Sequence, residues 1–124
     1  MKRIVLDTNF LLAISQFHVD VFSEIRRICD FPYKLYVIDK TIDELGILAK
    51  TPSKKAKQAA KLALSLIGGR VEVLKTGEGY ADDILAGMAD KDTIIATQDK
   101  GLKRKIKSVL ITIKQKKYLS LERT

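Results

Sequence analysis

The sequence predicts an α/β fold, a three-layer αβα domain in which helices cover both faces of a central parallel sheet of about five strands. Short continuous apolar runs, such as those at residues 4–6 and 35–38, recur along the chain and are typical of strands buried on both faces. Longer segments with apolar residues at helical spacing separate these runs, and helical crossovers favour parallel neighbours in a sheet. The length of 124 residues suits one hydrophobic core, so we expect a single domain over residues 1–124.

Strands and helices alternate along the whole chain. Asn9 is a favourable N-cap residue for the helix after the first strand, and Pro52-Ser53 opens a later helix that Gly68-Gly69 stops. The expected strands cover residues 4–6, 35–38, 71–74, 94–97 and 109–113. The expected helices cover residues 10–14, 19–28, 44–48, 53–67, 81–89 and 99–107.

The composition excludes several classes of protein. Apolar residues make up 46% and charged residues 31%, which is typical of a globular chain. With one cysteine, Cys29, and one histidine, His18, the chain cannot form a disulfide framework or a Cys/His zinc site. Asp7 ends the first apolar run too early for a signal peptide, and no apolar stretch approaches the roughly 18 residues that span a bilayer. We therefore expect a soluble, cytoplasmic protein that has no membrane partner.

The net charge of +8 is concentrated at one end of the chain. Residues 1–99 contain 14 Lys/Arg and 14 Asp/Glu, whereas residues 100–124 contain nine Lys/Arg and only Glu122. A block of like charge favours a polyanionic partner such as nucleic acid, because binding releases condensed counterions. The alternative is a surface that only keeps the protein in solution.

Carboxylates follow the predicted strands, near their carboxyl ends, where ligands bind in open α/β sheets. Asp7 follows the first strand directly, Glu44 lies in the helix after the second, Asp82 and Asp83 open the helix after the third, and Asp99 follows the fourth. Taken singly, the later acids have structural explanations: a helix dipole for the pair, an N-cap for Asp99 and a solvated position for Glu44. Solubility explains Asp7 poorly, because it comes directly after a buried strand.

Acids gathered at one edge of a sheet repel one another unless a cation neutralises them. Ligation by oxygen atoms alone suits Mg²⁺ or Mn²⁺ better than zinc. One or two such ions can activate water and stabilise an in-line displacement at phosphorus. The acids therefore predict a divalent metal site that acts on phosphate esters.

Four segments form an ordered set of short motifs. They are Leu6-Asp7-Thr8-Asn9, Asp43-Glu44-Leu45, Ala81-Asp82-Asp83-Ile84-Leu85 and Ala96-Thr97-Gln98-Asp99-Lys100-Gly101-Leu102. Each motif is weak by itself, but the four in this order and at these separations are specific. Together they resemble the PIN-domain nucleases, and the likeness covers essentially the whole chain.

The resemblance assigns roles to matching residues. It implies a parallel sheet of strand order 3-2-1-4-5 between helices. It further implies that Asp7, Glu44, Asp82 and Asp99 bind the metal and form the catalytic group, with Asp83 as the other candidate ligand of its pair. Thr8, Asn9 and Thr97 match residues that support such a site by hydrogen bonding.

Within the family, residues 77–83 and 97–106 most resemble the ribosomal-RNA-processing PIN endonucleases of archaea and eukaryotes. This implies a metal-dependent endoribonuclease that acts on a ribosomal RNA precursor, and it leaves open a homodimer or a partner in a processing complex. One alternative is the toxin ribonuclease of a toxin–antitoxin pair, because toxins have a bare domain of this length. The other is a catalytically inactive PIN module that binds RNA or protein.

Basic residues offer a surface that can hold RNA. One group is spaced four, three and four residues apart, which places its members on one helical face, and the other follows Asp99 directly. A basic rim beside an acidic pocket holds phosphates that the pocket alone would repel. The expected RNA-binding residues are Lys50, Lys54, Lys57, Lys61, Lys100, Lys103, Arg104 and Lys107.

Overall fold

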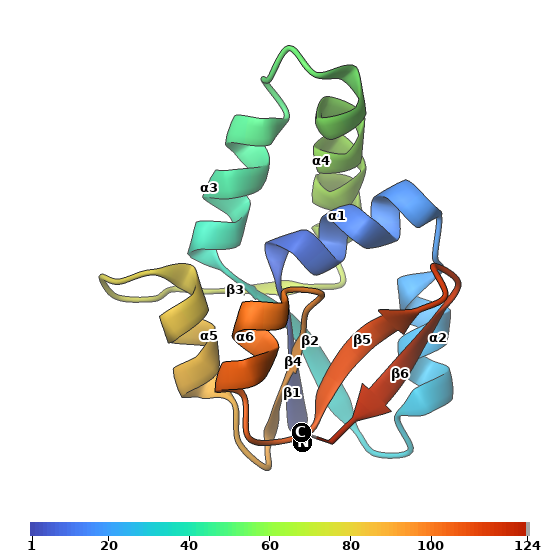
Figure 1. Cartoon of the computed structure of the whole chain (residues 1–124), viewed down its shortest axis with the longest axis vertical. Helices are drawn as coiled ribbons and strands as arrows, with labels where there is room; N and C mark the ends of the chain where they lie inside the picture. The colour runs from blue at the N-terminus through green and yellow to red at the C-terminus, as the bar shows by residue number, and fades with distance from the viewer. Residues whose placement is uncertain (124) are drawn as a thin grey trace.

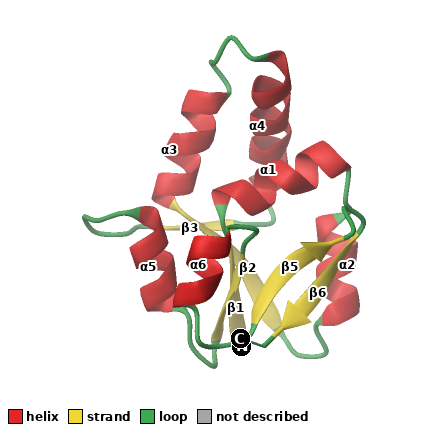
Figure 2. Cartoon of the chain, viewed as in Figure 1, coloured by secondary structure: helices red, strands yellow, loops and turns green. Residues whose placement is uncertain are grey.

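The computed structural model describes residues 1–123, so Thr124 of the expected domain lies outside the described residues. Within this range six strands form one sheet that lies between two layers of helices (Figures 1 and 2). The strands are β1 Lys2–Leu6, β2 Tyr33–Ile38, β3 Glu72–Leu74, β4 Thr93–Ala96, β5 Leu110–Lys114 and β6 Tyr118–Glu122. The helices are α1 Thr8–Phe17, α2 Val21–Ile28, α3 Asp39–Leu48, α4 Lys54–Ile67, α5 Ala81–Met88 and α6 Lys100–Lys105.

The sheet has the order β3-β2-β1-β4-β5-β6. All neighbours from β3 to β5 pair in parallel, which confirms the predicted α/β fold and the order 3-2-1-4-5. β1 lies in the middle, with β2 on one side and β4 on the other. This is the point at which strand order reverses, where open α/β sheets bind their ligands.

The sequence did not predict β6, which pairs antiparallel with β5. Gln115 and Lys116 adopt positive φ angles of 52° and 56° and turn the chain back tightly after β5. Leu119 and Leu121 then alternate with more polar neighbours, which is the period-two pattern of a strand. The sequence did not reveal this strand because the pattern is short and directly follows a lysine-rich turn. The sheet is therefore mixed at this edge.

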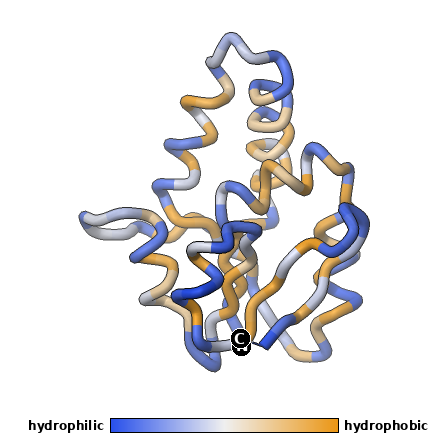
Figure 3. The backbone as a smooth tube through the Cα atoms, viewed as in Figure 1, coloured by the Kyte–Doolittle hydropathy of each residue, from blue (hydrophilic) through white to orange (hydrophobic). Residues whose placement is uncertain are grey.

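The two faces of the sheet bury different sets of side chains. In β1, Ile4 and Leu6 pack into one core with α1 to α4, whereas Val5 packs into a second core with Leu85 of α5 and Leu102 of α6. This alternation along a strand that is buried on both sides is the physical reason for a continuous apolar run. Figure 3 shows hydrophobic residues along the central strands and hydrophilic residues at the turn after β5.

The α3–α4 hairpin extends away from the sheet (Figure 1). α4 opens at Ser53, as predicted, and Ser53 caps it by accepting a hydrogen bond from the backbone N–H of Ala56. Alanines of α4, such as Ala60 and Ala63, are buried, and they allow it to approach its neighbours closely. Among residues 1–123 no helix is long and apolar enough to cross a bilayer.

Candidate active site

Asp7 lies at the end of the central strand, and the register of the sheet sets its position. Leu6 pairs with Ala96, and the Asp7 backbone N–H donates to the carbonyl oxygen of Ala96 at 2.9 Å. Asp7 therefore stands beside Thr97, the residue after β4. Its side chain is only 6% exposed, which is unusual for a carboxylate.

Asp7, and not Asn9 as the sequence suggested, caps α1. Its Oδ1 accepts a hydrogen bond from the backbone N–H of Thr8 at 2.8 Å, so α1 begins as soon as β1 ends. The side chain of Asn9 turns instead to the end of β4, where its Oδ1 accepts from the backbone N–H of Gln98 at 3.2 Å. The prediction that Asn9 caps this helix was wrong, because α1 begins at Thr8 and the residue at its N-cap position is Asp7.

Thr97 connects the acids at the carboxyl ends of β1 and β4. Its buried hydroxyl donates to Asp7 Oδ2 at 2.8 Å and accepts from the backbone N–H of Asp99 at 3.1 Å. The hydroxyl also lies 3.3 Å from Asn9 Oδ1, the next acceptor available to its proton. Thr8 extends the network, because its hydroxyl donates to Thr41 at 3.1 Å. Thr8, Asn9 and Thr97 thus hold the backbone and side chains around Asp7.

Burial and negative neighbours raise the pKa of Asp7. Burial is the largest cause and opposes hydrogen bonds from Thr97 and Thr8, which lower the pKa, while the charges of Asp82 and Asp99 raise it further. Removing a carboxylate from water disfavours its charged form, as does a second negative charge nearby. The charges that act most on the pKa of Asp7 are those of Asp82 and Asp99, so negative charge is concentrated at this end of the sheet.

Glu44 belongs to the same electrostatic cluster, although it comes from α3. The pKa of Glu44 is raised by burial first, then by the charge of Asp7, and also by that of Asp82, while hydrogen bonding to Thr8 opposes the rise. The structure thus brings Asp7, Glu44, Asp82 and Asp99 into electrostatic contact at one edge of the sheet. Their roles as metal ligands and catalytic groups remain predictions.

Asp82 and Asp83 face different partners. Asp83 is exposed, and its Oδ1 accepts from Lys105 Nζ of α6 at 3.1 Å. Asp82 is partly buried, and its negative charge raises the pKa of both Asp7 and Glu44. Of the adjacent pair, Asp82 is the better candidate ligand because Asp83 already has a cationic partner.

Asp99 combines a structural and a candidate functional position. Its Oδ1 accepts from the backbone N–H groups of Gly101 and Leu102 at 2.7 and 3.3 Å and caps α6. A Cβ atom at Gly101 would lie 3.2 Å from this oxygen, so glycine leaves room for the carboxylate. The cap fixes one oxygen of Asp99 and leaves Oδ2 available.

A cavity of about 380 Å³ opens beside the acidic cluster. Besides Glu44, Asp82 and Asp83 it is lined by Lys105, from the basic run that the sequence placed beside the acidic pocket, and by Tyr80, which the sequence reasoning did not place there. The Tyr80 side chain is 81% exposed. Its position two residues before Asp82 was the available signal, but nothing in the sequence showed which way the ring points.

The oxygen chemistry of the cluster fits Mg²⁺ or Mn²⁺. The negative charges of the four carboxylates repel one another, and hard divalent cations prefer such ligands. Among residues 1–123, however, no three Asp, Glu, His or Cys side chains are gathered closely enough to hold one ion. The fit therefore depends on donor type and on charge, and not on a preformed cage.

The predicted RNA-binding lysines lie in separate places. Lys54, Lys57 and Lys61 are exposed on α4, and Lys50 follows α3 at the tip of the projecting hairpin. Lys107 lines a different cavity beside Lys2, at the amino ends of the strands and opposite the acidic edge.

On α6 the basic side chains differ in their availability. Lys100 and Arg104 are exposed. Lys103 is half-buried instead, because its Nζ donates to Thr112 of β5 at 2.7 Å. Burial lowers the pKa of Lys103. Lys103 therefore supports β5 and is less available to a phosphate than its neighbours.

Comparison with known proteins identifies the fold family. Residues 4–116 match a family model described as a PIN like domain. The chain belongs to this family. It is also 30% identical over 129 aligned residues to ribonuclease VapC4 of Methanocaldococcus jannaschii, an alignment that covers 98% of this chain and 97% of that protein.

Two solved structures share the PIN fold. The PIN domain endonuclease Utp24 superposes with a TM-score of 0.80 at 24% identity over 98% of this chain and 92% of its own. VapBC2 from Rickettsia felis, bound to a DNA fragment from its promoter, gives a TM-score of 0.55 at 14% identity over 89% of this chain and 98% of its own. At these identities the likeness shows the fold alone. The names of these relatives show that PIN proteins include ribonucleases and endonucleases.

Replacement of Thr97 by valine tests the support of Asp7 in this PIN site. Valine keeps the branched shape but leaves Asp7 Oδ2 without its donor, so we expect the free energy of unfolding to fall by about 1–3 kcal/mol. We expect cleavage of RNA to fall about 10- to 100-fold, as when other supporting partners of ligands are lost. Thermal unfolding and cleavage rates of the purified variant measure both effects.

Thr93→Val is the matched control. Thr93 is as buried as Thr97, but its hydroxyl accepts from Arg3 at the amino end of β4. The Thr93→Val variant should be less stable than the wild type. At temperatures at which it is folded, it should cleave RNA at the wild-type rate. Equal losses of cleavage in both variants would show that Thr97 acts only through stability.

Proposed function

We propose that residues 1–124 form a single PIN nuclease domain that hydrolyses RNA internally and depends on Mg²⁺ or Mn²⁺. The observation that carries the proposal is the electrostatic cluster of Asp7, Glu44, Asp82 and Asp99 at the strand-order reversal of the sheet. A divalent cation bound there lowers the pKa of water and stabilises the charge that develops in an in-line displacement at phosphorus.

The residues of the chain divide the remaining tasks. Asp7 presents a fixed carboxylate, because Thr8 and Thr97 hold both of its oxygens. Glu44 and Asp82 approach the cluster from α3 and α5, next to the open cavity in which the scissile phosphate is proposed to bind. Attack of water on phosphorus with departure of the 3′ oxygen gives ends with 5′-phosphate and 3′-hydroxyl groups.

The test is cleavage of an end-labelled single-stranded RNA by the purified protein. We expect internal cuts in the presence of Mg²⁺ or Mn²⁺, none with a chelator, and recovery when the ion is restored. Ligation or phosphatase treatment of the fragments identifies the 5′ ends. Cleavage that persists unchanged in excess chelator would contradict metal dependence, and binding without any cleavage would favour the inactive RNA- or protein-binding module.

We propose a ribosomal RNA precursor as the substrate. The segments at residues 77–83 and 97–106 support this choice, since they resemble processing endonucleases. The toxin alternative has its own support in the 30% identity to ribonuclease VapC4. Incubation with a precursor that spans the processing sites, beside a messenger RNA of equal length, separates the two. A small gene that overlaps upstream of the coding sequence would favour the toxin.

The basic residues of α6 and the segment after it should contribute to RNA affinity. Replacement of Lys100, Arg104 and Lys107 by glutamine should reduce the slope of log affinity against log salt by about two, because each phosphate bound on a single strand adds roughly 0.7 to this slope. Titrations at several salt concentrations, with a chelator present to prevent cleavage, measure this slope.

Lys103→Gln is the internal control for that titration. The Lys103 ammonium is already bound to Thr112, so its loss should leave the slope close to that of the wild type. If the triple variant also keeps the wild-type slope, the C-terminal charge serves solubility or a protein partner and not RNA.

A further inference from the structure

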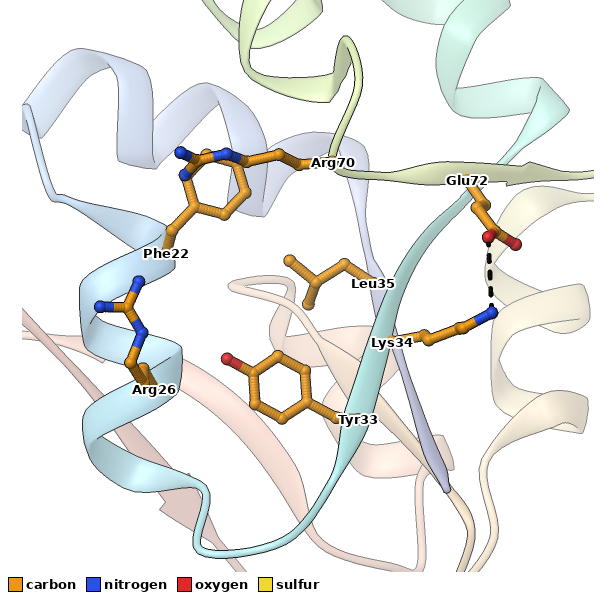
Figure 4. A pocket seen from close by; sticks show the side chains of 7 residues that line it. All are labelled: Phe22, Arg26, Tyr33, Lys34, Leu35, Arg70 and Glu72. Carbon is orange, nitrogen blue, oxygen red and sulfur yellow. Dashed lines mark ion pairs between the residues drawn. The ribbon is translucent and has the colours of Figure 1, made fainter.

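A second cavity lies away from the acidic edge, between α2 and the amino end of β2 (Figure 4). Its volume is about 420 Å³. Tyr33 and Leu35 point from β2 toward Phe22 of α2, whereas Lys34 points to the other side of the strand (Figure 4). Lys34 pairs there with Glu72 at 3.7 Å, so this carboxylate has its own partner.

Two arginines border the cavity without an ion pair. The guanidinium of Arg70 lies over the ring of Phe22, 4.6 Å from the ring centroid, and Arg26 projects from the next turn of α2. Among residues 1–123 neither arginine forms an ion pair with a carboxylate. The charges of both arginines lower the pKa of Asp20, but the carboxylate oxygens of Asp20 accept hydrogen bonds from the backbone N–H and the hydroxyl of Ser23.

This set of groups is suited to a nucleotide. Stacking occupies the face of the Arg70 guanidinium and leaves its in-plane N–H donors free for a phosphate, which guanidinium groups bind in a bidentate manner. Phe22 and Tyr33 supply aromatic surface of the kind on which unpaired bases stack. The hydroxyl of Tyr33 makes no hydrogen bond to residues 1–123 and is available to a base or a sugar.

We propose that this cavity is a docking subsite for single-stranded RNA, in which Arg26 and Arg70 bind a phosphate and Phe22 and Tyr33 contact a base. The inference rests on the proposed function, since it assumes an RNA substrate. It also answers a need of that function: the acidic cluster repels phosphate, and Lys105, the basic residue that lines its cavity, is already paired with Asp83.

The subsite is separated from the acidic cluster along the sheet. Tyr33 begins β2, and Ile38 ends it at the carboxyl edge, five residues away. At about 3.3 Å per residue the separation is about 16 Å. A stacked strand rises about 3.4 Å per nucleotide, so about five nucleotides are needed to reach both places. A trinucleotide bound at the acidic cluster is too short to reach the subsite, so loss of the subsite should reduce cleavage of long RNA and not cleavage of a trinucleotide.

The test is the affinity of the full chain for a 20-nucleotide single-stranded RNA, measured by fluorescence anisotropy in a chelator so that no cleavage occurs. Arg26→Gln with Arg70→Gln should weaken binding about tenfold or more and reduce the salt slope by about 0.7, as expected for the loss of one phosphate contact. Tyr33→Leu should weaken binding of the RNA about tenfold and leave binding of an abasic strand of the same length unchanged.

Lys91→Gln with Lys117→Gln is the matched control, since it removes two exposed charges elsewhere. An equal loss of affinity in this control would overturn the proposal, because the effect would then be one of net charge. So would a loss of trinucleotide cleavage in the arginine variant, measured with the metal ion restored, as large as its loss of 20-mer cleavage. Poly-glutamate that binds the wild type and loses affinity in the arginine variant, while RNA affinity is kept, would assign the cavity to an acidic protein partner. Failure of the wild type to cleave any RNA would contradict the nuclease proposal and leave these binding results intact.

Discussion

Asp7→Asn is expected to reduce RNA cleavage by more than about 100-fold while the chain stays folded. Asp7 is the buried member of the acidic cluster, and Asp82 and Asp99 both act on it electrostatically. Loss of a partner that only supports a metal ligand already costs about 10- to 100-fold in activity or affinity, so loss of a proposed ligand itself should cost more.

The fold should survive because the hydrogen bonds around position 7 can be rearranged. The amide oxygen of asparagine can still accept from the backbone N–H of Thr8. Its NH₂ group can donate to the Thr97 hydroxyl, which then turns its proton to Asn9 Oδ1, now 3.3 Å away. The Asp99 N–H keeps its acceptor in Thr97. Removal of a buried charge also relieves desolvation and repulsion, so stability at pH 7 should be equal to or above that of the wild type.

Asp83→Asn provides the matched control for this substitution. It makes the same chemical change in the same cluster of sequence motifs, but Asp83 is exposed and pairs with Lys105 at the surface. Cleavage rates under single-turnover conditions and melting temperatures of both variants decide the matter. A wild-type rate for Asp7→Asn would refute the catalytic assignment, and a loss for Asp83→Asn as large as that for Asp7→Asn would show that Asp83 also serves the site.

The central sheet could be predicted because strands buried on both faces leave a strong pattern. In β1 every residue from Ile4 to Leu6 is buried, so the run is apolar without interruption. Parallel strands also end at a common edge, which is why acids that follow different strands could be expected close together. β6 escaped prediction since an edge strand of five residues with partly exposed positions has a much weaker pattern.

The details of the site depend on side-chain directions that a linear sequence does not contain. Asn9 has the residue type of an N-cap, but only the geometry of the strand end shows that Asp7 takes this place. Lys103 belongs to a basic run on a short helix, yet contact with Thr112 turns it inward. Arg26, Tyr33 and Arg70 are far apart in sequence and share no motif, so the cavity that they line required the folded chain.

Mn²⁺ is expected to raise the melting temperature of the wild-type protein at pH 7.5 and to do so much less at pH 5. An ion that binds only the folded state stabilises it by about 2.7 kcal/mol at 100 times its dissociation constant. For a chain of this length that corresponds to about 10 °C. At lower pH, protons compete for the carboxylates whose pKa is raised, Asp7 and Glu44, and the stabilisation shrinks.

In a chelator the pH dependence of these two groups should have the opposite sign. The folded-state pKa of Asp7 and of Glu44 lies above the unfolded value, so between the two values the folded state binds more protons. Their contribution to stability therefore falls as pH rises through this window from about 4 upward and stays low above it. Asp20, whose pKa is lowered by hydrogen bonds from Ser23, contributes in the reverse direction, since its stabilisation is lost as pH falls.

Comparison with Asp7→Asn separates the site from these background groups. The difference in melting temperature between variant and wild type, measured in chelator, should grow from pH 5 to pH 7.5, because only the wild type carries the buried charge. With Mn²⁺ at pH 7.5 the order should reverse, since the wild type gains stability and the variant gains little. Calorimetry or dye-based melting at both pH values, with and without the ion, gives the four numbers needed. An equal Mn²⁺-induced rise in the melting temperature of both proteins would show that the ion binds elsewhere. No rise in either protein would show that the acidic cluster is not a metal site.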